Sequence, residues 1–397
     1  MIEKIIQKLT LILIVIFPIG LLLRIKLSAN VYVVPQDVIV GIIAVMTLYY
    51  FIRRKRTPNS KFFKFQLLFV LVGVVSLIIN YVLHTDVKFI QSLLYPLRYL
   101  AYLSLIVAPL NSSLLKQMKM LILLSGTFIV VIGFWQFFFY YDLYKLFYLG
   151  WDNHLYRMFS TFLDPNFSGV FFVIFLFYLL WGITSNKFKY VYKEIIIAFC
   201  TLIAMYLTFS RTALMALFAG IISFAVLKKK MKEVLLVIVL LIAFLFLISD
   251  THVEGLNPLR IASSSKRIDS VKESLDIISK NSVFGVGFNA FRYAQLRYGY
   301  RNEKGASWSN ADAGTDNSFL FVASTTGIVG LTVYLISLYY LGKDTITKQK
   351  KIRIVLLPIM ISVFAASLFT NVLFYTPILT FWFLTMRVVS VGSRVDR

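Results

Sequence analysis

Charged residues, cysteines and metal-binding spacings are all scarce in this chain. Only 15% of its 397 residues are charged and 59% are hydrophobic, whereas a soluble globular protein carries about 25% charged residues. The single cysteine, Cys200, excludes an intrachain disulfide and a cysteine-based metal site. No Asp-x-Asp pair occurs, and no spacing of His and carboxylates is typical of zinc. We therefore expect a membrane protein that uses neither a metal nor another cofactor.

Long apolar runs recur from one end of the chain to the other, which predicts membrane-spanning helices. The fold class is therefore all-α: residues 1–397 form one polytopic transmembrane unit with about twelve helices. No small-residue cleavage pattern follows the first run, so we expect that run to be a retained helix. The predicted spans are Leu9–Leu23, Val33–Ile52, Phe65–Leu83, Phe89–Leu110, Met120–Tyr140, Phe167–Ile183, Ile195–Phe209, Thr212–Leu227, Val234–Ile248, Ser318–Leu341, Ile354–Phe374 and Pro377–Val391.

The net charge of +23 is distributed unequally over the two sides of these spans. The termini and the short connectors on their side hold 25 of the 41 Lys and Arg but only 5 of the 18 acids. Short basic loops face the cytoplasm, so we predict a multi-pass membrane protein with both termini in the cytoplasm. The positive charge thus indicates orientation in a lipid bilayer, and we expect no nucleic-acid partner.

Two connectors, residues 141–166 and residues 250–317, are long and polar, and both are predicted on the extracytoplasmic side. The second holds 68 residues with 9 basic and 8 acidic side chains, and a loop of that size usually has a function. Part of it has apolar residues at helical spacing, namely Ile268, Val271, Leu275 and Ile278. We expect an amphipathic helix there, capped by the serines at 263–265 and lying on the membrane surface or on the bundle.

Other features of the two loops have two interpretations each. The Gly285-Val286-Gly287 segment is explained equally well by a loop turn and by a phosphate cradle. Loop aromatics could stack on sugars or form an interfacial belt, and they are Trp151, Tyr293, Tyr298, Tyr300 and Trp308.

Arg211 joins two unusually short predicted helices, Ile195–Phe209 and Thr212–Leu227. Helices of that length cover about 23 Å of a hydrocarbon core about 30 Å thick. We therefore expect Arg211 to lie recessed in a cavity open to the extracytoplasmic side, where a guanidinium needs an anionic partner or water. The alternative is an arginine that extends from a helix end to the interface.

Further charged residues are predicted at the same membrane face. Arg98 lies inside the span Phe89–Leu110, where it either neutralises a ligand or pairs with a polar neighbour. Asp164 precedes Pro165, and Asp316 stands shortly before the span that begins at Ser318, so each could simply be a helix N-cap. With Arg157, these residues and Arg211 are predicted to face one extracytoplasmic vestibule.

Four groups of residues follow one another in a distinctive order. They are Arg157 with Phe162-Leu163-Asp164-Pro165-Asn166; Leu207-Thr208-Phe209-Ser210-Arg211-Thr212-Ala213; Arg267-Ile268-Asp269-Ser270-Val271 with Phe284-Gly285-Val286-Gly287-Phe288; and Asp316-Asn317-Ser318-Phe319-Leu320 with Gly327-Ile328-Val329-Gly330-Leu331. Together they resemble the bacterial O-antigen ligase/polymerase superfamily. The motifs cover about residues 150–335, and the topology covers the whole chain. Many ligases carry His-Asn where this chain has Asp316-Asn317, a departure that favours a polymerase over a ligase.

The resemblance implies transfer of a glycan from an undecaprenyl-pyrophosphate carrier, with inversion and without metal or nucleotide sugar. Family arginines that match Arg211 and Arg267 bind the pyrophosphate. We expect polymerisation of O-antigen or capsule repeat units, with Asp316 as the base. The further substrate-binding residues that we expect are Arg157, Arg98, Asp164, Asn166 and Asn317, with Asp164 also the reserve base.

Elementary chemistry agrees with this expectation. Breaking a sugar–pyrophosphate bond builds negative charge on the leaving group, and preorganised cations stabilise that charge when no metal is present. Arginine suits the task because its planar fork donates two parallel hydrogen bonds to phosphate and stays protonated. A carboxylate within hydrogen-bond reach can take the proton of the acceptor hydroxyl. His154 and His252 are alternative bases.

Two other functions stay open at this point. A ligase would pass the glycan to lipid A-core or another acceptor, whereas a polymerase passes it to another lipid-linked repeat. A transporter or flippase is the main rival without catalysis, but the chain shows no matching halves of the kind common in transporters. The expected partners are the lipid-linked donor, a glycan or lipid-linked acceptor and the bilayer. A chain-length regulator is a further candidate.

Overall fold

The computed structural model describes residues 2–28, 31–55, 57–144, 154–184, 191–232, 261–301 and 314–391. Every predicted span within these residues overlaps a helix. The overlapping helices are α1 (Ile2–Ile16), α2 (Pro35–Arg54), α3 (Lys61–Leu83), α4 (Phe89–Val107), α5 (Ser112–Phe139), α6 (Pro165–Thr184), α7 (Val191–Leu207), α8 (Arg211–Lys228), α12 (Ser318–Ile346), α13 (Lys350–Ser367) and α14 (Thr376–Val391). The span Val234–Ile248, His252, Trp151 and Trp308 lie outside the described residues.

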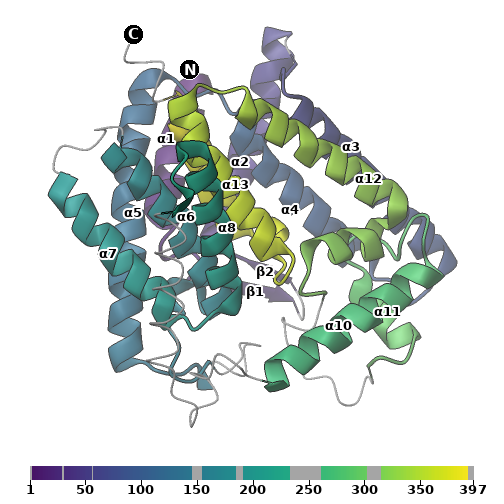
Figure 1. Cartoon of the computed structure of the whole chain (residues 1–397). Helices are drawn as coiled ribbons and strands as arrows, with labels where there is room; N and C mark the ends of the chain where they lie inside the picture. Colours follow the sequence, from purple (N-terminus) through teal and green to yellow (C-terminus); the bar gives the residue numbers. More distant parts are fainter. Residues whose placement is uncertain are drawn as a thin grey trace.

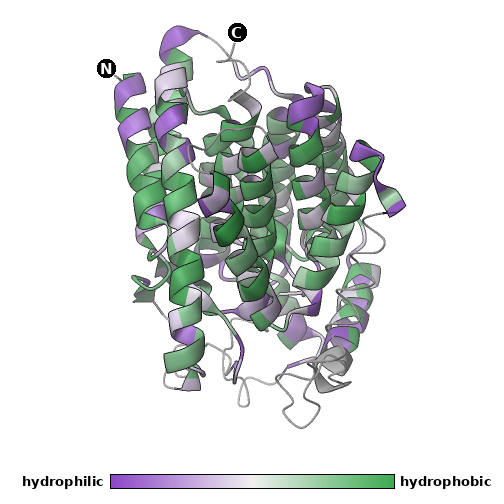
Figure 2. Ribbon diagram, turned by 60° about the vertical axis from the view of Figure 1, so that its left-hand side comes forward, coloured by the Kyte–Doolittle hydropathy of each residue, from purple (hydrophilic) through white to green (hydrophobic). Residues whose placement is uncertain are grey.

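Seven of the described helices are long and apolar enough to cross a membrane, and they are α2, α3, α4, α5, α6, α8 and α12. The apolar segments stand side by side as one bundle, with hydrophilic residues gathered toward its two ends (Figure 2). Helices α1, α7 and α14 are shorter, with 15, 17 and 16 residues. The multi-pass helical architecture agrees with the sequence, and the number of twelve spans stays a prediction.

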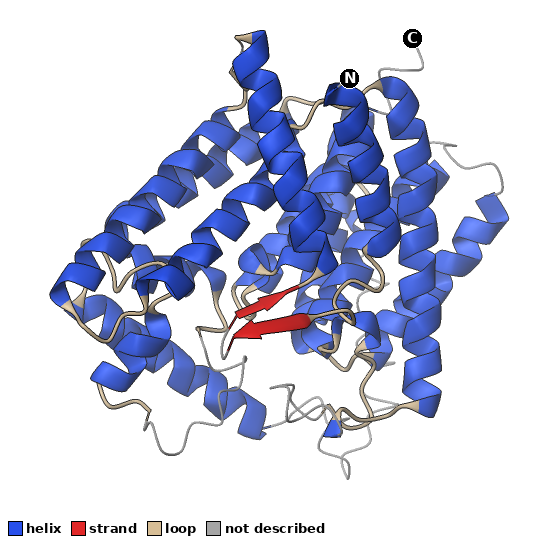
Figure 3. Ribbon diagram, turned by 180° about the vertical axis from the view of Figure 1, so that it is seen from behind, coloured by secondary structure: helices blue, strands red, loops and turns tan. Residues whose placement is uncertain are grey.

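The chain after α1 departs from the predicted all-α fold. The helix ends at Ile16 rather than at Leu23, because Pro18 disfavours helical backbone at the residue before it and cannot donate a backbone hydrogen bond. Strands β1 (Ile25–Ser28) and β2 (Val31–Val33) follow and pair in antiparallel fashion. This hairpin lies among the helices toward the end of the bundle opposite the N-terminus (Figure 3).

The first turns of α1 and the last turns of α14 lie at one end of the bundle. The Asn111 side-chain amide donates to Gln7 of α1, and Arg387 of α14 donates to the carbonyl of Ala108 at 2.6 Å. We call the opposite end, where α6, α8, α12 and α14 begin, the site end (Figure 1). Its orientation relative to the cytoplasm stays a prediction.

Two further helices, α10 (Ile261–Lys280) and α11 (Phe291–Arg297), lie at the site end and belong to the long polar connector (Figure 1). Helix α10 covers the predicted amphipathic stretch, but Ile268 and Leu275 of the predicted apolar stripe keep 54% and 52% of their surface exposed, whereas Ile277, outside that stripe, is fully buried. The predicted serine cap is wrong, because the helix begins at Ile261, before the serines at 263–265.

The Gly285-Val286-Gly287 segment fills a break in α12. The Val286 N–H donates to the Ser324 carbonyl at 2.8 Å, and Ile328 N–H donates to the Ser282 carbonyl at 2.8 Å. A Cβ on Gly285 would lie 2.5 Å from backbone atoms of Thr325, so only glycine fits. The described backbone therefore supports the turn interpretation of this segment, whose amides bind α12.

Aromatic rings support the short 3₁₀ helix η3 (Val372–Phe374) between α13 and α14. The ring of Phe374 lies 5.0 Å from that of Tyr99 on α4 and 5.1 Å from that of Phe321 on α12, measured between centroids. The ring of Phe288 lies 5.9 Å from that of Phe374, also between centroids. This packing fixes the connector between α13 and α14 at the centre of the site end.

Candidate functional site

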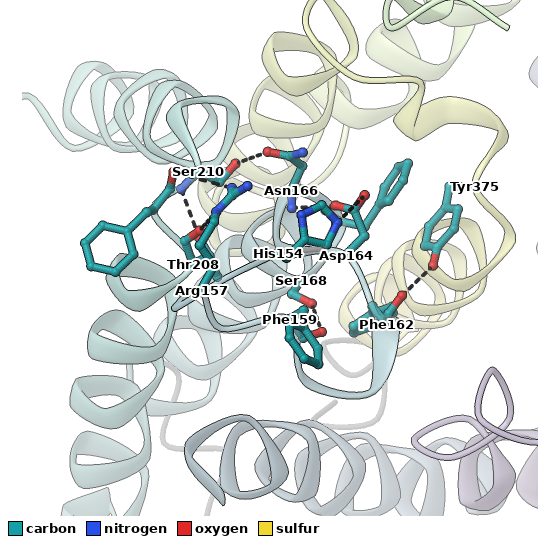
Figure 4. Close-up of polar contacts among 12 residues, drawn as sticks. His154, Arg157, Phe159, Phe162, Asp164, Asn166, Ser168, Thr208, Ser210 and Tyr375 are labelled. Carbon is teal, nitrogen blue, oxygen red and sulfur yellow. Dashed lines mark hydrogen bonds and ion pairs between the residues drawn. The ribbon is translucent and has the colours of Figure 1, made fainter. Parts of the chain in front are cut away.

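The turn that carries Arg211 is held by Arg157. The buried Arg157 guanidinium donates from Nε to the Thr208 carbonyl at 2.9 Å and from Nη2 to the Phe209 carbonyl at 3.5 Å (Figure 4). The Met158 N–H also donates to the Leu207 carbonyl at 2.9 Å. These carbonyls end α7 and would otherwise lack helical donors. Arg157 therefore fixes the position of the turn between α7 and α8.

Ser210 and Asn166 fix the start of α8. The Ser210 hydroxyl accepts from the Ala213 N–H as the N-cap of α8 and donates to Asn166 Oδ1 at 2.9 Å (Figure 4). Phe209, before it, has a left-handed backbone with φ of 46°. Asn166, predicted to bind substrate, thus ties α6 to the first turn of α8 through its side-chain oxygen.

Asp164 is the N-cap of α6, as its place before Pro165 predicted. Its Oδ1 accepts from the backbone N–H groups of Asn166 at 2.7 Å and Phe167 at 3.3 Å. Its Oδ2 lies 3.9 Å from Nε2 of His154 (Figure 4). One carboxylate oxygen is therefore committed to the helix, and the other faces an imidazole.

Arg211 and Arg267 come together in space. Arg211 is the first residue of α8 and is half-buried. Arg267 lies on α10, in the polar connector, and its charge is near enough to repel that of Arg211. The two arginines predicted to bind pyrophosphate are thus within electrostatic range of each other.

The start of α12 is capped by Asn317 and not by Asp316. The Asn317 side-chain oxygen accepts from the N–H groups of Phe319 at 2.8 Å and Leu320 at 3.0 Å. Its amide donates to the Leu368 carbonyl at 3.0 Å. The cap interpretation of Asp316 is therefore wrong, and the exposed Asp316 carboxylate is not used in capping.

Arg98 has an identified partner in Asp37. Its Nε donates to Asp37 Oδ1 at 2.7 Å, and its Nη2 donates to the Thr376 hydroxyl at 3.0 Å. Asp37 also accepts from the Tyr102 hydroxyl at 2.8 Å and from the Val34 N–H at 3.1 Å. The polar neighbour considered in the sequence is thus Asp37, at the first turn of α2.

The connector between α13 and α14, residues 368–376, joins these parts. Thr370 lies beside Thr212 of α8, with 3.4 Å between hydroxyl oxygens, and its carbonyl accepts from Ser318 of α12. The Tyr375 ring stacks on Phe167 of α6 at 3.7 Å, and its hydroxyl donates to the Phe162 carbonyl. The connector therefore contacts the first turns of α6, α8 and α12, and its last residue, Thr376, accepts from Arg98.

Sequence reasoning missed several polar residues of this site. Besides Asp37 and Tyr375, Arg24 lies over the Tyr32 ring at 3.5 Å and interacts electrostatically with Tyr375 and Arg98. Arg292 of α11 interacts with Tyr95 of α4. The one signal available in the sequence was a polar residue beside proline or glycine at an outer span end, as in Asp37 after Pro35.

The interface between α10 and α11 holds an ionisable group. Burial raises the pKa of the Glu273 carboxyl, while a hydrogen bond with Gln295 and the charge of Arg301 act in the opposite direction. Burial also lowers the pKa of the Arg301 guanidinium, against the attraction of Glu273. This polar contact connects α11 to the helix that carries Arg267.

Within the described residues, no group of three or more His, Cys, Asp or Glu side chains is placed to hold a metal ion. A model of the family described as O-antigen ligase matches residues 196–335, and no curated protein matches the chain. The matched segment contains Arg211, Arg267 and Asp316, and it confirms the predicted resemblance to the O-antigen ligase/polymerase superfamily. With the apolar helices, it supports a multi-pass membrane enzyme of the ligase/polymerase type.

Proposed function

We propose that the protein polymerises oligosaccharide repeat units carried on undecaprenyl pyrophosphate at the outer face of the bacterial plasma membrane, without a metal. The observation that supports the proposal is that Arg211, at the start of α8, lies within electrostatic range of Arg267 on α10, a segment far away in the chain. Two like charges in one place repel each other, and an anion bound between them turns that cost into attraction. A pyrophosphate, with its several oxygens, matches two guanidinium forks.

The proposed reaction breaks the bond between the sugar anomeric carbon and the pyrophosphate oxygen. The electron pair stays on the leaving pyrophosphate, where Arg211 and Arg267 stabilise the charge. The acceptor hydroxyl oxygen attacks the opposite face of that carbon and inverts it. Its proton passes to a carboxylate.

Asp316 is the first candidate for this base. Its carboxylate is exposed beside the N-cap of α12, and the capping is done by Asn317. Asp164 is the reserve, because one of its oxygens already accepts two backbone hydrogen bonds.

Arg157 supports the reaction indirectly in this proposal. Its guanidinium is buried against the carbonyls of Thr208 and Phe209, so it fixes the turn from which Arg211 extends. A shift of about 1 Å in a catalytic group can lower a rate about a hundredfold. Arg157 is therefore a positioning residue for Arg211.

The proposal is tested by glycan chain length in cells that express Arg211→Ala or Arg267→Ala. We expect single repeat units in place of long polymer. The matched control is Lys228→Ala, which removes the same charge from the exposed opposite end of α8. Normal polymer from correctly inserted Arg211→Ala protein would refute the pyrophosphate role. Unchanged turnover in Asp316→Asn would exclude Asp316 as the base.

A ligase is the second candidate, because the matching family model is described as O-antigen ligase. Purified protein in detergent separates the candidates when it receives only lipid-linked oligosaccharide. A polymerase lengthens the glycan under these conditions. A ligase produces no product until a second kind of acceptor is added. A transporter leaves the lipid-linked oligosaccharide unchanged with or without the second acceptor, because it catalyses no glycan transfer and transport needs a sealed compartment.

A further inference from the structure

The segment that follows α10 is held from two sides. We call residues 281–288 the docked segment. On one side its backbone binds the break in α12, where the Gly287 N–H donates to the Thr325 carbonyl at 3.1 Å, beside the bond between Val286 and Ser324. On the other side the docked segment faces α3.

Two buried polar side chains of α3 make this second contact. The Asn80 amide donates to the Gly285 carbonyl at 2.9 Å and to the Ser76 carbonyl at 3.0 Å, so both of its N–H groups are used. The Ser76 hydroxyl is a shared donor to the carbonyls of Phe284 and Thr325. Asn80 is 3% exposed and Ser76 is fully buried. A polar pair inside a long apolar helix thus binds backbone groups of the docked segment and of α12.

The close approach of α3 to the docked segment is a property of one helix face. Gly73, Ser76 and Asn80 follow one another at steps of three and four residues, which places them on the same face of α3. A Cβ on Gly73 would lie 2.9 Å from the Phe288 ring, so Phe288 packs where α3 has no side chain. This face of α3 is therefore shaped to receive the docked segment.

The docked segment also determines the direction of α10, because the earlier turns of that helix are exposed. Among the described residues 267–280 of α10, only Ser274 and Ile277 are buried. Ile277 packs in one apolar cluster with Val286 of the docked segment. Helix α10 lies at the site end beside α11 and α12 (Figure 1), and it is fixed there near its last turns. Arg267 stands in the exposed part.

This arrangement amplifies small changes at the docked segment. Arg267 precedes Ile277 by ten residues, which corresponds to roughly 15 Å along a helix. A tilt of about 5° at the fixed end therefore displaces Arg267 by about 1 Å, and a misplacement of that size can lower a rate about a hundredfold.

Resting on the proposed function, we infer that Asn80 and Ser76 are positioning residues, which set the direction of α10 and thereby hold Arg267 at the anion site that it shares with Arg211. They act through the docked segment, and neither belongs to the anion site itself. Their side chains are the part of the contact that substitutions can remove, because the bonds to α12 are made by backbone groups.

The distance between α10 and the bundle tests this placement. Spin labels are attached through Lys272→Cys on α10 and Phe139→Cys at the end of α5, two exposed positions. The full-length protein also carries Cys200→Ser, which removes its single cysteine. Pulsed electron paramagnetic resonance measures the distance distribution. We expect a narrow distribution in this protein and a broader one when Asn80→Leu or Ser76→Ala is added.

Gln66→Leu is the matched control. Gln66 is a fully buried amide on the same helix, and its hydrogen bonds among the described residues are with Ser337 of α12 at 2.7 Å and Tyr99 of α4 at 2.9 Å. The substitution weakens the contact of α3 with α12 without removing a bond to the docked segment. The distance distribution should therefore stay narrow.

Glycan extension by the purified unlabelled protein shows whether the placement acts through Arg267. Asn80→Leu should lower kcat/KM about tenfold to a hundredfold. In protein that already carries Arg267→Ala, the same substitution should cause little further loss, because residues that act through one another are not additive. A general loss of stability would reduce the activity of both proteins equally.

An unchanged distance distribution in both Asn80→Leu and Ser76→Ala would overturn the inference, as would equal broadening in Gln66→Leu. Fully additive losses of activity for Asn80→Leu and Arg267→Ala would also overturn it. If Arg267→Ala alone retains full extension, the pyrophosphate role in the proposed function is wrong. Broadening confined to Asn80→Leu and Ser76→Ala would then still show that these residues set the direction of α10.

Discussion

Arg98 and Arg211 are both arginines of the site end, but their surroundings differ. Arg98 has a carboxylate partner at 2.7 Å, and that carboxylate is itself bound by Tyr102 and the Val34 N–H. Arg211 stands at the first turn of α8, where its charge is repelled by Arg267. A helix N-terminus is also the unfavourable end for a cation. The fold thus stabilises one arginine and concentrates positive charge at the other.

This difference separates an arginine that stabilises the fold from arginines that are expected to bind an anion. A charge neutralised inside the bundle contributes to folding, and its partner is costly to remove. Charge gathered at a helix start, by contrast, lowers stability and is expected where an anion is bound. Stability and activity should therefore respond oppositely to substitutions in the two regions.

The largest effect is expected from Asp37→Ala. The substitution leaves the Arg98 guanidinium without its carboxylate in the bundle, and breaking a buried pair costs about 3–5 kcal/mol. Since Arg98 keeps 30% accessible surface, the low end of about 3 kcal/mol is expected. Thermal unfolding in detergent measures this loss of stability. Asp86→Ala, which removes an exposed pair with Arg297, is the control, and an equal loss in both variants would remove the contrast.

Arg211→Ala should act on the rate. Loss of one preorganised donor to developing charge lowers kcat by about 10²–10³-fold, whereas the unfolding temperature should not fall. Arg211→Lys should restore part of the rate, because the charge remains without the fork. Glycan extension by purified protein measures the rate. An Arg211→Ala protein that unfolds earlier than wild type would contradict the proposed division between the two regions.

Arg157→Gln should affect both quantities. Its bond to the Thr208 carbonyl is buried, and a hydrogen bond to a charged group contributes about 1.5–3 kcal/mol. The α7–α8 turn should loosen, and the rate should fall through misplacement of Arg211. Unfolding and glycan extension are measured together. A lower rate at unchanged stability would instead identify Arg157 as a direct contact to the anion.

The smallest effect concerns Glu273. Its pKa is raised above the ordinary 4.5 by burial, so the folded protein holds this proton more tightly than the unfolded chain. Stability is therefore full below pH 4.5 and is lost as the pH rises through the raised folded pKa. Glu273→Gln should flatten this slope in unfolding temperature against pH. Superimposable profiles for variant and wild type would show that Glu273 does not titrate in this way.

Local signals in the sequence were sufficient for the helices and for some caps. Each apolar run in the described residues became a helix, and Asp164 before Pro165 caps α6 as expected. The first helix begins and ends seven residues before the predicted span Leu9–Leu23, because apolar residues continue beyond Pro18 although the proline ends the helix. At the start of α12, adjacent Asp316 and Asn317 are both good caps. Only the backbone direction decides that Asn317 takes the role.

Contacts between distant segments could not be obtained in this way. Asp37 and Arg98 belong to different helices, and nothing in either span indicates the other as its partner. The connector at 368–376 carries no distinctive signal in the sequence, because threonine and tyrosine are common between apolar runs. Its importance follows from packing, which places Thr370 beside Thr212 and Tyr375 against Phe167.

The order of apolar runs, the unequal basic charge and the motifs around Arg211, Arg267 and Asp316 determined a helical membrane protein and its family resemblance. These are local or compositional properties, and the hydrophobic effect acts on them wherever the chain lies. Tertiary structure alone decided that Arg98 is anchored by Asp37, and it placed Arg211 within electrostatic range of Arg267, as the family resemblance had implied. The physical reason is that electrostatic energy depends on the distance between charges, and only the packing of the helices sets that distance.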